Sequence, residues 1–426
     1  MSPEAEIRRR IRERGRITFA EFMDLALYWP GGGYYLGREP IGPTGDYYTS
    51  PLVHPAFGAL LSVHLFQLWQ LLDRPDPFSV VEPGAGNGLL CRDLLSYSAH
   101  LPLEFGRALR YLCLDRRQAP GTERDLPAGA GAPRAARIAA AGLPLRGIRG
   151  CILSNEYLDS FPVHQVTVRR GSLQEVYVTL NGKTLAAEAA DPSTPALAAR
   201  LEGLGIALAE GQTAEINLGL DSWAKEAESA LEAGLVLTID YGHPAPELYS
   251  PERRRRGTLT TFYRHIQTAA PFRHIGRQDM TAQVDFTSMA SAGRRAGLPV
   301  IGLARQRDFL NCLGLRSFQE RLTSLRLSPR VLEANRAGVL DLVRPGGLGE
   351  FVVLAQGKNL GQPELWGFGP SPEALALAEE LPVPLLTPDH LSLIEGKYPL
   401  AESDFEALWP FSKGRSGEPP GRSEFQ

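Results

Sequence analysis

A short glycine-rich segment is the most informative feature of this 426-residue sequence. Glu82 ends an apolar run, and Gly84, Gly86 and Gly88 follow at alternate positions. Glycines allow a strand to turn sharply into a helix and let the backbone approach a bound ligand closely. The dinucleotide pattern G-x-G-x-x-G/A fails because Leu89 occupies the third small-residue position. The pattern that remains, E-x-G-x-G-x-G between a strand and a helix, predicts an S-adenosylmethionine loop; a tight turn without a ligand is the alternative.

Further polar residues stand where the other apolar runs end. Asp115 closes the second run, where a carboxylate can accept both hydroxyls of a ribose or can simply cap the strand. The third run leads into Asn155, Glu156 and Asp159, and the fourth ends in Asp240. Ligands in an open α/β sheet lie beyond the carboxyl ends of the strands, so we expect these groups near the reacting methyl group. The alternative is that Glu156 and Asp159 cap a helix and Asp240 holds a loop.

Three carboxylates at one sheet edge would suit a cationic methyl acceptor. Guanidinium fits best, because a carboxylate matches its forked pair of donors. Arginine stays protonated in water, so such an acceptor must be oriented and helped to lose a proton. We therefore assign Glu156, Asp159 and Asp240 to catalysis. Asn155 resembles the Asn or Asp of the N-P-P-Y motif in nucleic-acid aminomethyltransferases, but the two prolines are absent.

The elements that must position these residues alternate between strand and helix. Four short apolar runs separated by helical stretches are expected to be buried strands: 78–81, 111–114, 151–153 and 235–239. This alternation indicates a Rossmann-like α/β fold with a doubly wound, mostly parallel sheet. A further run at 351–354 is expected to supply a final edge strand. Two alternating segments, 164–168 and 173–178, predict a hairpin within an inserted α+β subdomain.

Three regions follow from this organisation. Residues 1–75 are predicted to form an N-terminal helical extension, with a capping box that begins at Thr18. Residues 76–357 are predicted to form the methyltransferase domain, with an insertion at about 162–232. Residues 358–426 are Pro-rich, and we expect a C-terminal extension that ends in a disordered tail.

Composition narrows the classes of partner. A formal net charge of -3 gives no global attraction to nucleic acid or to an anionic membrane, so we expect neither partner. The arginine run 253–256 has no interleaved aromatic residues and is expected to be a solvated loop. The most apolar long stretch, 59–72, is too short and too polar to span a bilayer.

Cysteine and histidine spacing argues against a metal site. The four cysteines form no C-x-x-C pair, and the eight histidines show no H-x-x-x-H spacing. We therefore expect no metal and a reducing compartment, which is the cytoplasm if the source is bacterial.

Six motifs in a fixed order resemble those of the MidA family of class I methyltransferases, whose mitochondrial members are complex I assembly factors that act as protein arginine methyltransferases. The motifs are GDYYTSP at 45–51, EPGAGNG at 82–88, SNEYLDSFPV at 154–163, IDYG at 239–242, GTL at 257–259 and QDMTAQVDF at 278–286. Two positions depart from the pattern: 260–263 reads TTFY where a basic residue and Cys-Tyr are commoner, and Gln283 replaces a frequent His. These two departures bear on the identity of the substrate more than on cofactor binding.

The resemblance implies S-adenosyl-L-methionine as the cofactor and an N-terminal helical extension that lies over it. It implies cofactor contacts from these residues: Asp46, Thr49, Glu82, Gly84, Gly86, Gly88, Asp115 and Asn155. It also implies symmetric ω-N dimethylation of an arginine in a respiratory complex I subunit, and therefore a protein substrate. Two other functions stay open, namely a non-catalytic assembly chaperone and a small-molecule or nucleic-acid methyltransferase on the same fold.

Overall fold

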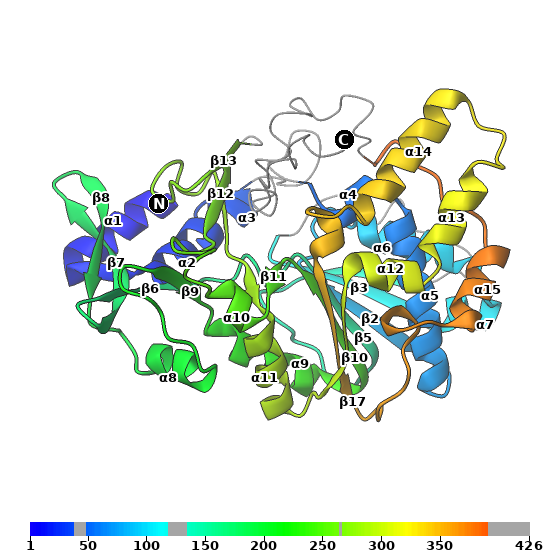
Figure 1. Cartoon of the computed structure of the whole chain (residues 1–426), viewed down its shortest axis with the longest axis horizontal. Coiled ribbons are helices and arrows are strands. Elements are labelled where there is room, and N and C mark those ends of the chain that lie inside the picture. The colour runs from blue at the N-terminus through cyan, green and yellow to red at the C-terminus, as the bar shows by residue number, and fades with distance from the viewer. Residues whose placement is uncertain (38–47, 118–133, 264–265, 391–426) are drawn as a thin grey trace, which may run out of the picture.

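A seven-stranded sheet forms the centre of the molecule, and helices cover both of its faces (Figure 1). The computed structural model describes residues 1–37, 48–117, 134–263 and 266–390. The strands, in spatial order, are β16 (Val300–Arg305), β17 (Val352–Lys358), β10 (Leu231–Asp240), β5 (Ile148–Asn155), β2 (Phe78–Pro83), β3 (Leu109–Asp115) and β4 (Arg134–Ala139).

The strand order creates a ligand-binding edge. Neighbouring strands from β4 to β10 pair in parallel, whereas β17 runs antiparallel to both β10 and β16. The chain leaves β2 towards β3 and β4, then crosses back to β5 on the opposite side of β2. This reversal between β2 and β5 is a switch point, where ligands bind at the carboxyl ends of the strands.

The four buried strands predicted from apolar runs are confirmed as β2, β3, β5 and β10. The prediction that 351–354 forms an edge strand is wrong, because β17 lies between β10 and β16. The sequence reading missed β4 and β16, the two real edges. Both are half-exposed, and so neither carries the continuous apolar run of a strand buried on both faces.

Alternate side chains of the sheet enter two separate cores. Leu235 and Leu237 of β10 pack with helices α5 (Ala56–Leu71) and α6 (Leu89–Ser98) on one face. Val236, between them, packs with α9 (Gly219–Ala230) and α11 (Phe286–Ala296) on the other face. Successive side chains of a strand point to opposite faces of the sheet. The position of a residue in its strand therefore decides on which face its side chain lies at the ligand-binding edge.

The N-terminal region contains α1 (Pro3–Arg14), β1 (Arg16–Thr18), α2 (Phe19–Tyr28) and α3 (Tyr34–Gly37). Thr18 caps α2 as predicted, because its Oγ1 accepts the Glu21 N–H at 3.1 Å. The Glu21 carboxylate instead accepts hydrogen bonds from Arg10 and Arg14 of α1, at 2.7 and 2.9 Å, and so ties the two helices together.

The predicted hairpin is confirmed as the antiparallel pair β6 (His164–Arg169) and β7 (Ser172–Asn181). The other elements of this region are β8 (Thr184–Ala190), α8 (Ala196–Gly203) and β9 (Thr213–Ile216). The strands of this region form a second sheet together with β1. Its order is β1-β7-β6-β9, with β8 beside β7. Because β1 belongs to the N-terminal region, this sheet joins the insertion to the N-terminal extension.

Smaller elements complete the frame. Two short sheets contain β11 (Gly242–His243) with β15 (Val284–Asp285), and β13 (Ile266–Thr268), β12 (Thr260–Tyr263) and β14 (Asp279–Thr281). Further helices are α4 (Ser50–Val53), α7 (Leu103–Ala108), α10 (Ala245–Leu248), α12 (Gln306–Cys312), α13 (Leu315–Leu322), α14 (Pro329–Leu342) and α15 (Pro372–Glu380), with 3-10 turns η2 (Leu348–Glu350) and η3 (Trp366–Phe368). No helix in the described parts of the chain is both long and apolar enough to cross a membrane.

The described part of the C-terminal extension packs against the methyltransferase core. Gln67 of α5 donates to the Glu364 carbonyl at 2.8 Å and accepts from the Trp366 N–H at 2.9 Å. His390 bonds to Asp93 of α6 at 3.0 Å. The predicted disordered tail lies outside the described residues, and the domain boundaries stay a prediction.

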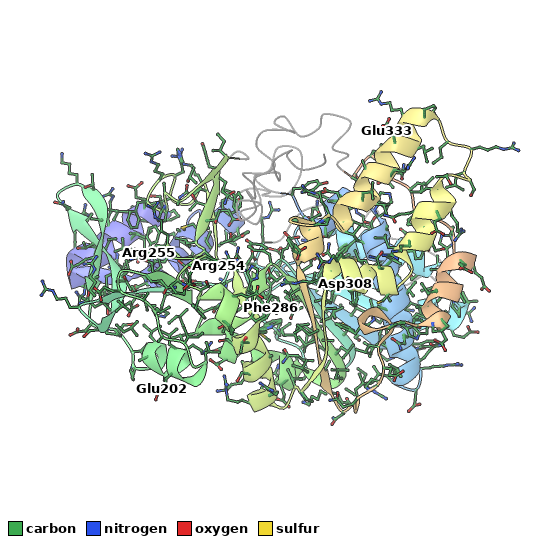
Figure 2. All side chains as sticks on the ribbon, in the orientation of Figure 1. Glu202, Arg254, Arg255, Phe286, Asp308 and Glu333 are labelled. Atoms are coloured by element: carbon green, nitrogen blue, oxygen red, sulfur yellow. The ribbon has the colours of Figure 1, made fainter. Side chains whose placement is uncertain are left out.

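The arginine run at 253–256 is largely solvated, as expected, with one exception. Arg253, Arg255 and Arg256 are exposed, whereas Arg254 is half-buried and bonds to His243 at 2.5 Å. Figure 2 shows Arg254 and Arg255 on the side of the central sheet that carries the insertion. Arg254 is therefore an internal contact of the fold.

Candidate active site

A cavity of about 270 Å³ opens at the carboxyl ends of the parallel strands. Pro83, Asp115, Ala140 and Glu156 line it, and each ends or directly follows a different strand among β2, β3, β4 and β5. Helix α9 contributes Trp223 to the opposite wall. The cavity therefore lies at the switch point of the sheet, where the sequence placed the cofactor.

The glycine loop adopts a backbone conformation that requires glycine. Gly84, Gly86 and Gly88 have φ angles of 71°, 52° and 79°, which L side chains rarely adopt. A Cβ on Gly84 would lie 2.6 Å from the Tyr157 ring. Gly84 and Gly86 line the cavity, whereas Gly88 begins helix α6. The loop thus presents bare backbone to a ligand, as an S-adenosyl group requires.

Asp115 joins the end of β3 to the glycine loop. One of its carboxylate oxygens accepts the Gly86 N–H at 3.1 Å, and the other accepts the Arg117 N–H at 2.9 Å. Each carboxylate oxygen has two acceptor sites, so both can still bind a ribose hydroxyl. Asp115 also lines the cavity, and its position therefore fits the expected ribose contact.

Glu82 lies beneath the loop and not in the cavity wall. It is 5% exposed and accepts the Tyr111 hydroxyl hydrogen at 2.8 Å. Burial raises the pKa of Glu82 to about 8. Beside it, Arg137 of β4 donates to the Gly86 carbonyl at 2.8 Å. Glu82 thus bonds to the neighbouring strand β3 and is not among the residues that line the cavity, and the cofactor contact expected from the motif stays a prediction.

The turn after β5 places Glu156 in an unusual backbone conformation. Its φ of 48° is left-handed, which costs a non-glycine residue about 1–3 kcal/mol and persists only where the surroundings hold it. The Glu156 carboxylate accepts from the Ser50 N–H at 3.3 Å and from the Asn155 side-chain amide at 3.1 Å. Glu156 lines the cavity, whereas Asn155 reaches it through Glu156.

Asp240 holds this turn in place. Its Oδ2 accepts the backbone N–H groups of Tyr157, Leu158 and Asp159 at 3.1, 2.9 and 3.3 Å. Its Oδ1 accepts the Tyr241 N–H at 2.9 Å, and the side chain is fully buried. A carboxylate already engaged in this way cannot also reach a substrate. The geometry therefore favours the alternative that Asp240 holds the loop, and its catalytic role stays a prediction.

Asp159 is a buried carboxylate with one oxygen engaged. Its Oδ2 accepts the Tyr241 hydroxyl at 2.5 Å, whereas its Oδ1 has no hydrogen-bond partner within the described residues. Burial raises the pKa of Asp159 to about 6. Burial, followed by the charge of Asp159, raises the pKa of Glu156 to about 8. The Asp159 carboxyl group therefore lies close enough to affect the ionisation of Glu156.

Two residues expected at the cofactor come from the first motif. Thr49 is buried and directly precedes Ser50, whose N–H contacts Glu156, but Thr49 is not among the described residues that line the cavity. Asp46 lies outside the described residues. In the part of the chain that the structure describes, no group of three or more His, Cys, Asp and Glu side chains is arranged to hold a metal ion.

The sequence reading missed the aromatic wall that the N-terminal extension adds. The Tyr28 hydroxyl of α2 donates to the Ser160 carbonyl at 2.9 Å, and its ring stacks on Tyr35 with centroids 5.5 Å apart. The Arg116 guanidinium lies 4.1 Å from the centre of the Tyr28 ring. All four residues line the cavity. No local pattern distinguishes Tyr28 from a core residue of α2, so only the tertiary contact reveals it.

The Gly84→Ala variant should bind S-adenosylhomocysteine, the demethylated form of the expected cofactor, at least about tenfold more weakly than wild type. The added Cβ would meet the Tyr157 ring, and the left-handed φ would be strained. Isothermal titration calorimetry measures the Kd. Gly182→Ala is the matched control, because Gly182 has a φ of 60° in the β7–β8 turn and nothing lies within 4 Å of its Cβ position. Equal affinity in both variants would contradict the assignment.

Glu156→Gln should change how stability depends on pH. Burial raises the folded-state pKa of Glu156 from 4.5 to about 8, so between these values the folded state keeps a proton that the unfolded chain has lost. Wild type therefore loses stability as pH rises through that window, and the glutamine variant lacks this contribution of residue 156 to the loss. We expect the melting temperature of the variant, relative to that of wild type, to be higher at about pH 8.5 than at about pH 5. A difference that is the same at both pH values would refute the raised pKa.

Two curated proteins align with about four-fifths of this chain. The Drosophila melanogaster "Protein arginine methyltransferase NDUFAF7 homolog, mitochondrial" is 28% identical over 372 residues, which are 81% of this chain and 82% of that protein. The Homo sapiens "Protein arginine methyltransferase NDUFAF7, mitochondrial" is 27% identical over 384 residues, 80% of each protein.

A solved structure with the same architecture contains a ligand. The crystal structure of a COG1565 superfamily member from Burkholderia thailandensis bound to S-adenosyl-homocysteine superposes with a TM-score of 0.74. It is 27% identical and covers 86% of this chain and 94% of its own. This match confirms the predicted Rossmann-like α/β methyltransferase fold.

A family model described as "Putative S-adenosyl-L-methionine-dependent methyltransferase" matches residues 60–304, more than half of the chain. The match includes the glycine loop, Asp115 and the turn after β5. It confirms both the family resemblance and the predicted S-adenosyl-L-methionine cofactor, which the glycine cradle and the free acceptor sites of Asp115 fit. The chain belongs to the Methyltransf_28 family of S-adenosyl-L-methionine-dependent methyltransferases.

Proposed function

We propose that the protein methylates a guanidinium nitrogen of an arginine in a protein substrate. The observation that carries this proposal is the carboxylate pair at the reacting end of the site. Glu156 lines the cofactor cavity, and the charge of Asp159 acts on the Glu156 pKa. Asp159 itself is buried and is not among the residues that line the cavity. A carboxylate in the cavity wall, with a second one buried close to it, favours an acceptor that is itself a cation.

The hydrogen-bonding capacity of the turn supports a donor-rich acceptor. Within the described residues, Asp159 Oδ1 and Asn155 Oδ1 are buried acceptors without a partner. Buried polar atoms are normally satisfied, and neither residue is among those that line the cavity, so a substrate that brings N–H donors would pair with these oxygens after a movement of the turn. Guanidinium carries five N–H donors in a planar fork and no acceptor. A neutral hydroxyl or amine would leave more of these oxygens unpaired.

The ionisation of the pair also fits a permanent cation. Burial raises the pKa of Glu156 to about 8, so at neutral pH this carboxyl group is largely protonated while no cation is bound. A bound guanidinium stabilises the charged carboxylate and therefore lowers that pKa. Arginine binding should thus expel a proton and leave both carboxylates ionised around the acceptor.

The residues divide the work between orienting the acceptor and moving a proton. S-adenosylmethionine supplies a methyl group on a sulfonium and leaves as S-adenosylhomocysteine, so the protein need not activate the donor. Glu156 and Asp159 would hold the guanidinium so that one nitrogen faces the methyl group. As the N–C bond forms, that nitrogen becomes more acidic, and Glu156 would accept its proton. Tyr241 fixes Asp159 through their hydrogen bond.

The relatives support the same acceptor, because curated proteins that align with about four-fifths of this chain are named protein arginine methyltransferases. Symmetric dimethylation and a respiratory complex I subunit as the substrate are the finer parts of the proposal. They rest on the family resemblance of the six motifs and not on the site geometry.

Transfer of labelled methyl groups tests the proposal. Cell extract from a strain that lacks this protein is incubated with purified enzyme and methyl-labelled S-adenosylmethionine, then separated into protein, nucleic-acid and small-molecule fractions. We expect label in protein and, after hydrolysis, in ω-N-methylated arginine. Glu156→Gln should lose at least about 100-fold of this activity and still bind S-adenosylhomocysteine. Glu188→Gln, an exposed glutamate of β8, is the matched control.

Label in another amino acid, in nucleic acid or in a small molecule would contradict arginine methylation. Full activity of Glu156→Gln would remove its proposed role. Binding of S-adenosylhomocysteine without label in any fraction would favour the non-catalytic assembly chaperone.

A further inference from the structure

Two surface segments bring exposed arginines together on the side of the molecule that carries the insertion; Figure 2 labels Arg255 there. Four of these residues form what we call the arginine cluster: Arg169, Arg170, Arg255 and Arg256. None of the four forms an ion pair within the described part of the chain. The cluster therefore presents positive charge to an outside partner.

Polar contacts hold the two segments side by side. The Glu210 carboxylate accepts the Arg170 N–H in the β6–β7 turn at 2.8 Å. The Glu210 carbonyl accepts from the Arg255 guanidinium at 3.1 Å, and the Thr213 N–H donates to the Arg255 carbonyl at 3.0 Å. The β6–β7 turn and the 255–256 loop are thus fixed relative to each other, so the cluster exists before a partner binds.

The cluster differs from the other arginine-rich surface of the chain. On α1, Arg8, Arg9 and Arg10 each pair with a glutamate of the same helix, at 2.8, 2.8 and 2.7 Å. In the cluster, the Glu210 carboxylate bonds to backbone N–H groups of the β6–β7 turn instead. Like charges held close together repel and lower stability. A positive patch without internal pairing is typical of a surface that meets a negatively charged partner.

The 255–256 loop leads to the acidic turn of the candidate active site. Thr258, two residues after this loop, accepts the Gln283 N–H through its hydroxyl oxygen at 3.2 Å. The adjacent Ala282 N–H donates to the Asp159 carbonyl at 2.9 Å. Two hydrogen bonds therefore connect the segment that carries half of the cluster to the turn beside the proposed acceptor.

The chemistry of the cluster favours an acidic peptide over a nucleic acid. The forked guanidinium group matches carboxylates and phosphates alike. Single-stranded nucleic acids, however, are also held by aromatic side chains on which the bases stack. The segments 169–172, 210–213 and 252–257 contain no aromatic residue. Two exposed glutamates, Glu210 and Glu252, also interrupt a continuous track for a phosphate backbone.

We propose that the arginine cluster docks an acidic segment of the protein substrate, apart from the arginine that is methylated. The proposal rests on the proposed function in one respect, namely that the substrate is a protein. Docking outside the cavity adds binding energy that is the same in the ground state and the transition state. It therefore lowers the KM for acidic substrates and contributes little to kcat.

Fluorescence anisotropy with a labelled oligoglutamate peptide tests the surface without assuming any reaction. Arg255→Gln/Arg256→Gln should bind this peptide at least about fivefold more weakly than wild type, because each lost guanidinium removes a charged contact. The difference should narrow as NaCl rises from about 50 to about 500 mM, since salt screens exposed charges. The matched control is Arg12→Gln/Arg326→Gln, which removes the same charge from exposed positions elsewhere and should bind like wild type.

Methylation kinetics show whether docking serves the reaction. With extract protein as the substrate, Arg255→Gln/Arg256→Gln should raise the KM by at least about threefold more than it lowers kcat. A lower kcat at an unchanged KM would contradict docking. Absence of label in protein would refute the proposed function, and the peptide measurement alone would then decide the binding surface.

Equal peptide affinity in wild type and Arg255→Gln/Arg256→Gln would overturn the proposal, and so would an equal loss in the control variant. Tighter binding of an oligothymidine of the same length, lost in the same variant, would assign the cluster to nucleic acid and contradict a protein partner. The melting temperature shows whether the variant folds. If it does not, Arg169→Gln/Arg170→Gln on the other segment provides the same test with the same expected loss.

Discussion

The Asp240 carboxylate accepts backbone N–H groups from the turn after β5 and from Tyr241, and the acidic end of the site depends on these bonds. A turn that points several N–H groups at one buried spot needs an acceptor there, and the two oxygens of one carboxyl group satisfy it. The same bonds hold Glu156 in its left-handed conformation. Without them, neither Glu156 nor Asp159 would have a fixed position relative to the cofactor cavity.

A second set of contacts fixes the cofactor loop. Arg137 of β4 supports it through the Gly86 carbonyl, and Asp115 connects it to the end of β3. The loop can therefore present its backbone without a side chain to anchor it. Tyr28 from the N-terminal extension then covers the cavity and bonds to Ser160, in the turn that Asp240 organises. The N-terminal extension and the end of β10 thus both contact the turn after β5.

Local sequence patterns predicted the parts of the structure that obey local rules. The glycine loop was predictable because strand, turn and helix each leave a short-range signal, and the buried strands because burial on both faces requires continuous apolar runs. The Thr18 cap was predictable for the same reason. The edge strands β4 and β16 were not, since their half-exposed patterns resemble those of loops.

The roles of individual acidic residues depend on long-range contacts. In the sequence, Asp240 is one of several strand-end acids, and only its four amide contacts distinguish an anchor from a catalytic group. Glu82 has the same ambiguity, and its bond to Tyr111 is a contact that the sequence does not reveal. Tyr28 and Trp223 lie on helices whose spacing indicates only burial. Their places in the cavity wall follow from how the N-terminal extension and α9 pack on the sheet.

Hydrogen–deuterium exchange of the Asp240→Asn variant tests this account most directly. The asparagine side chain keeps one acceptor oxygen and replaces the other with a donor, so it cannot satisfy all of the amides. We predict that the amides of 157–159 exchange at least about tenfold faster in the variant, equivalent to ~1.4 kcal/mol, while amides of the β10 interior keep their protection. Unchanged protection at 157–159 would contradict the claim that Asp240 holds the acidic turn, and with it the basis for placing Glu156 and Asp159 at the acceptor.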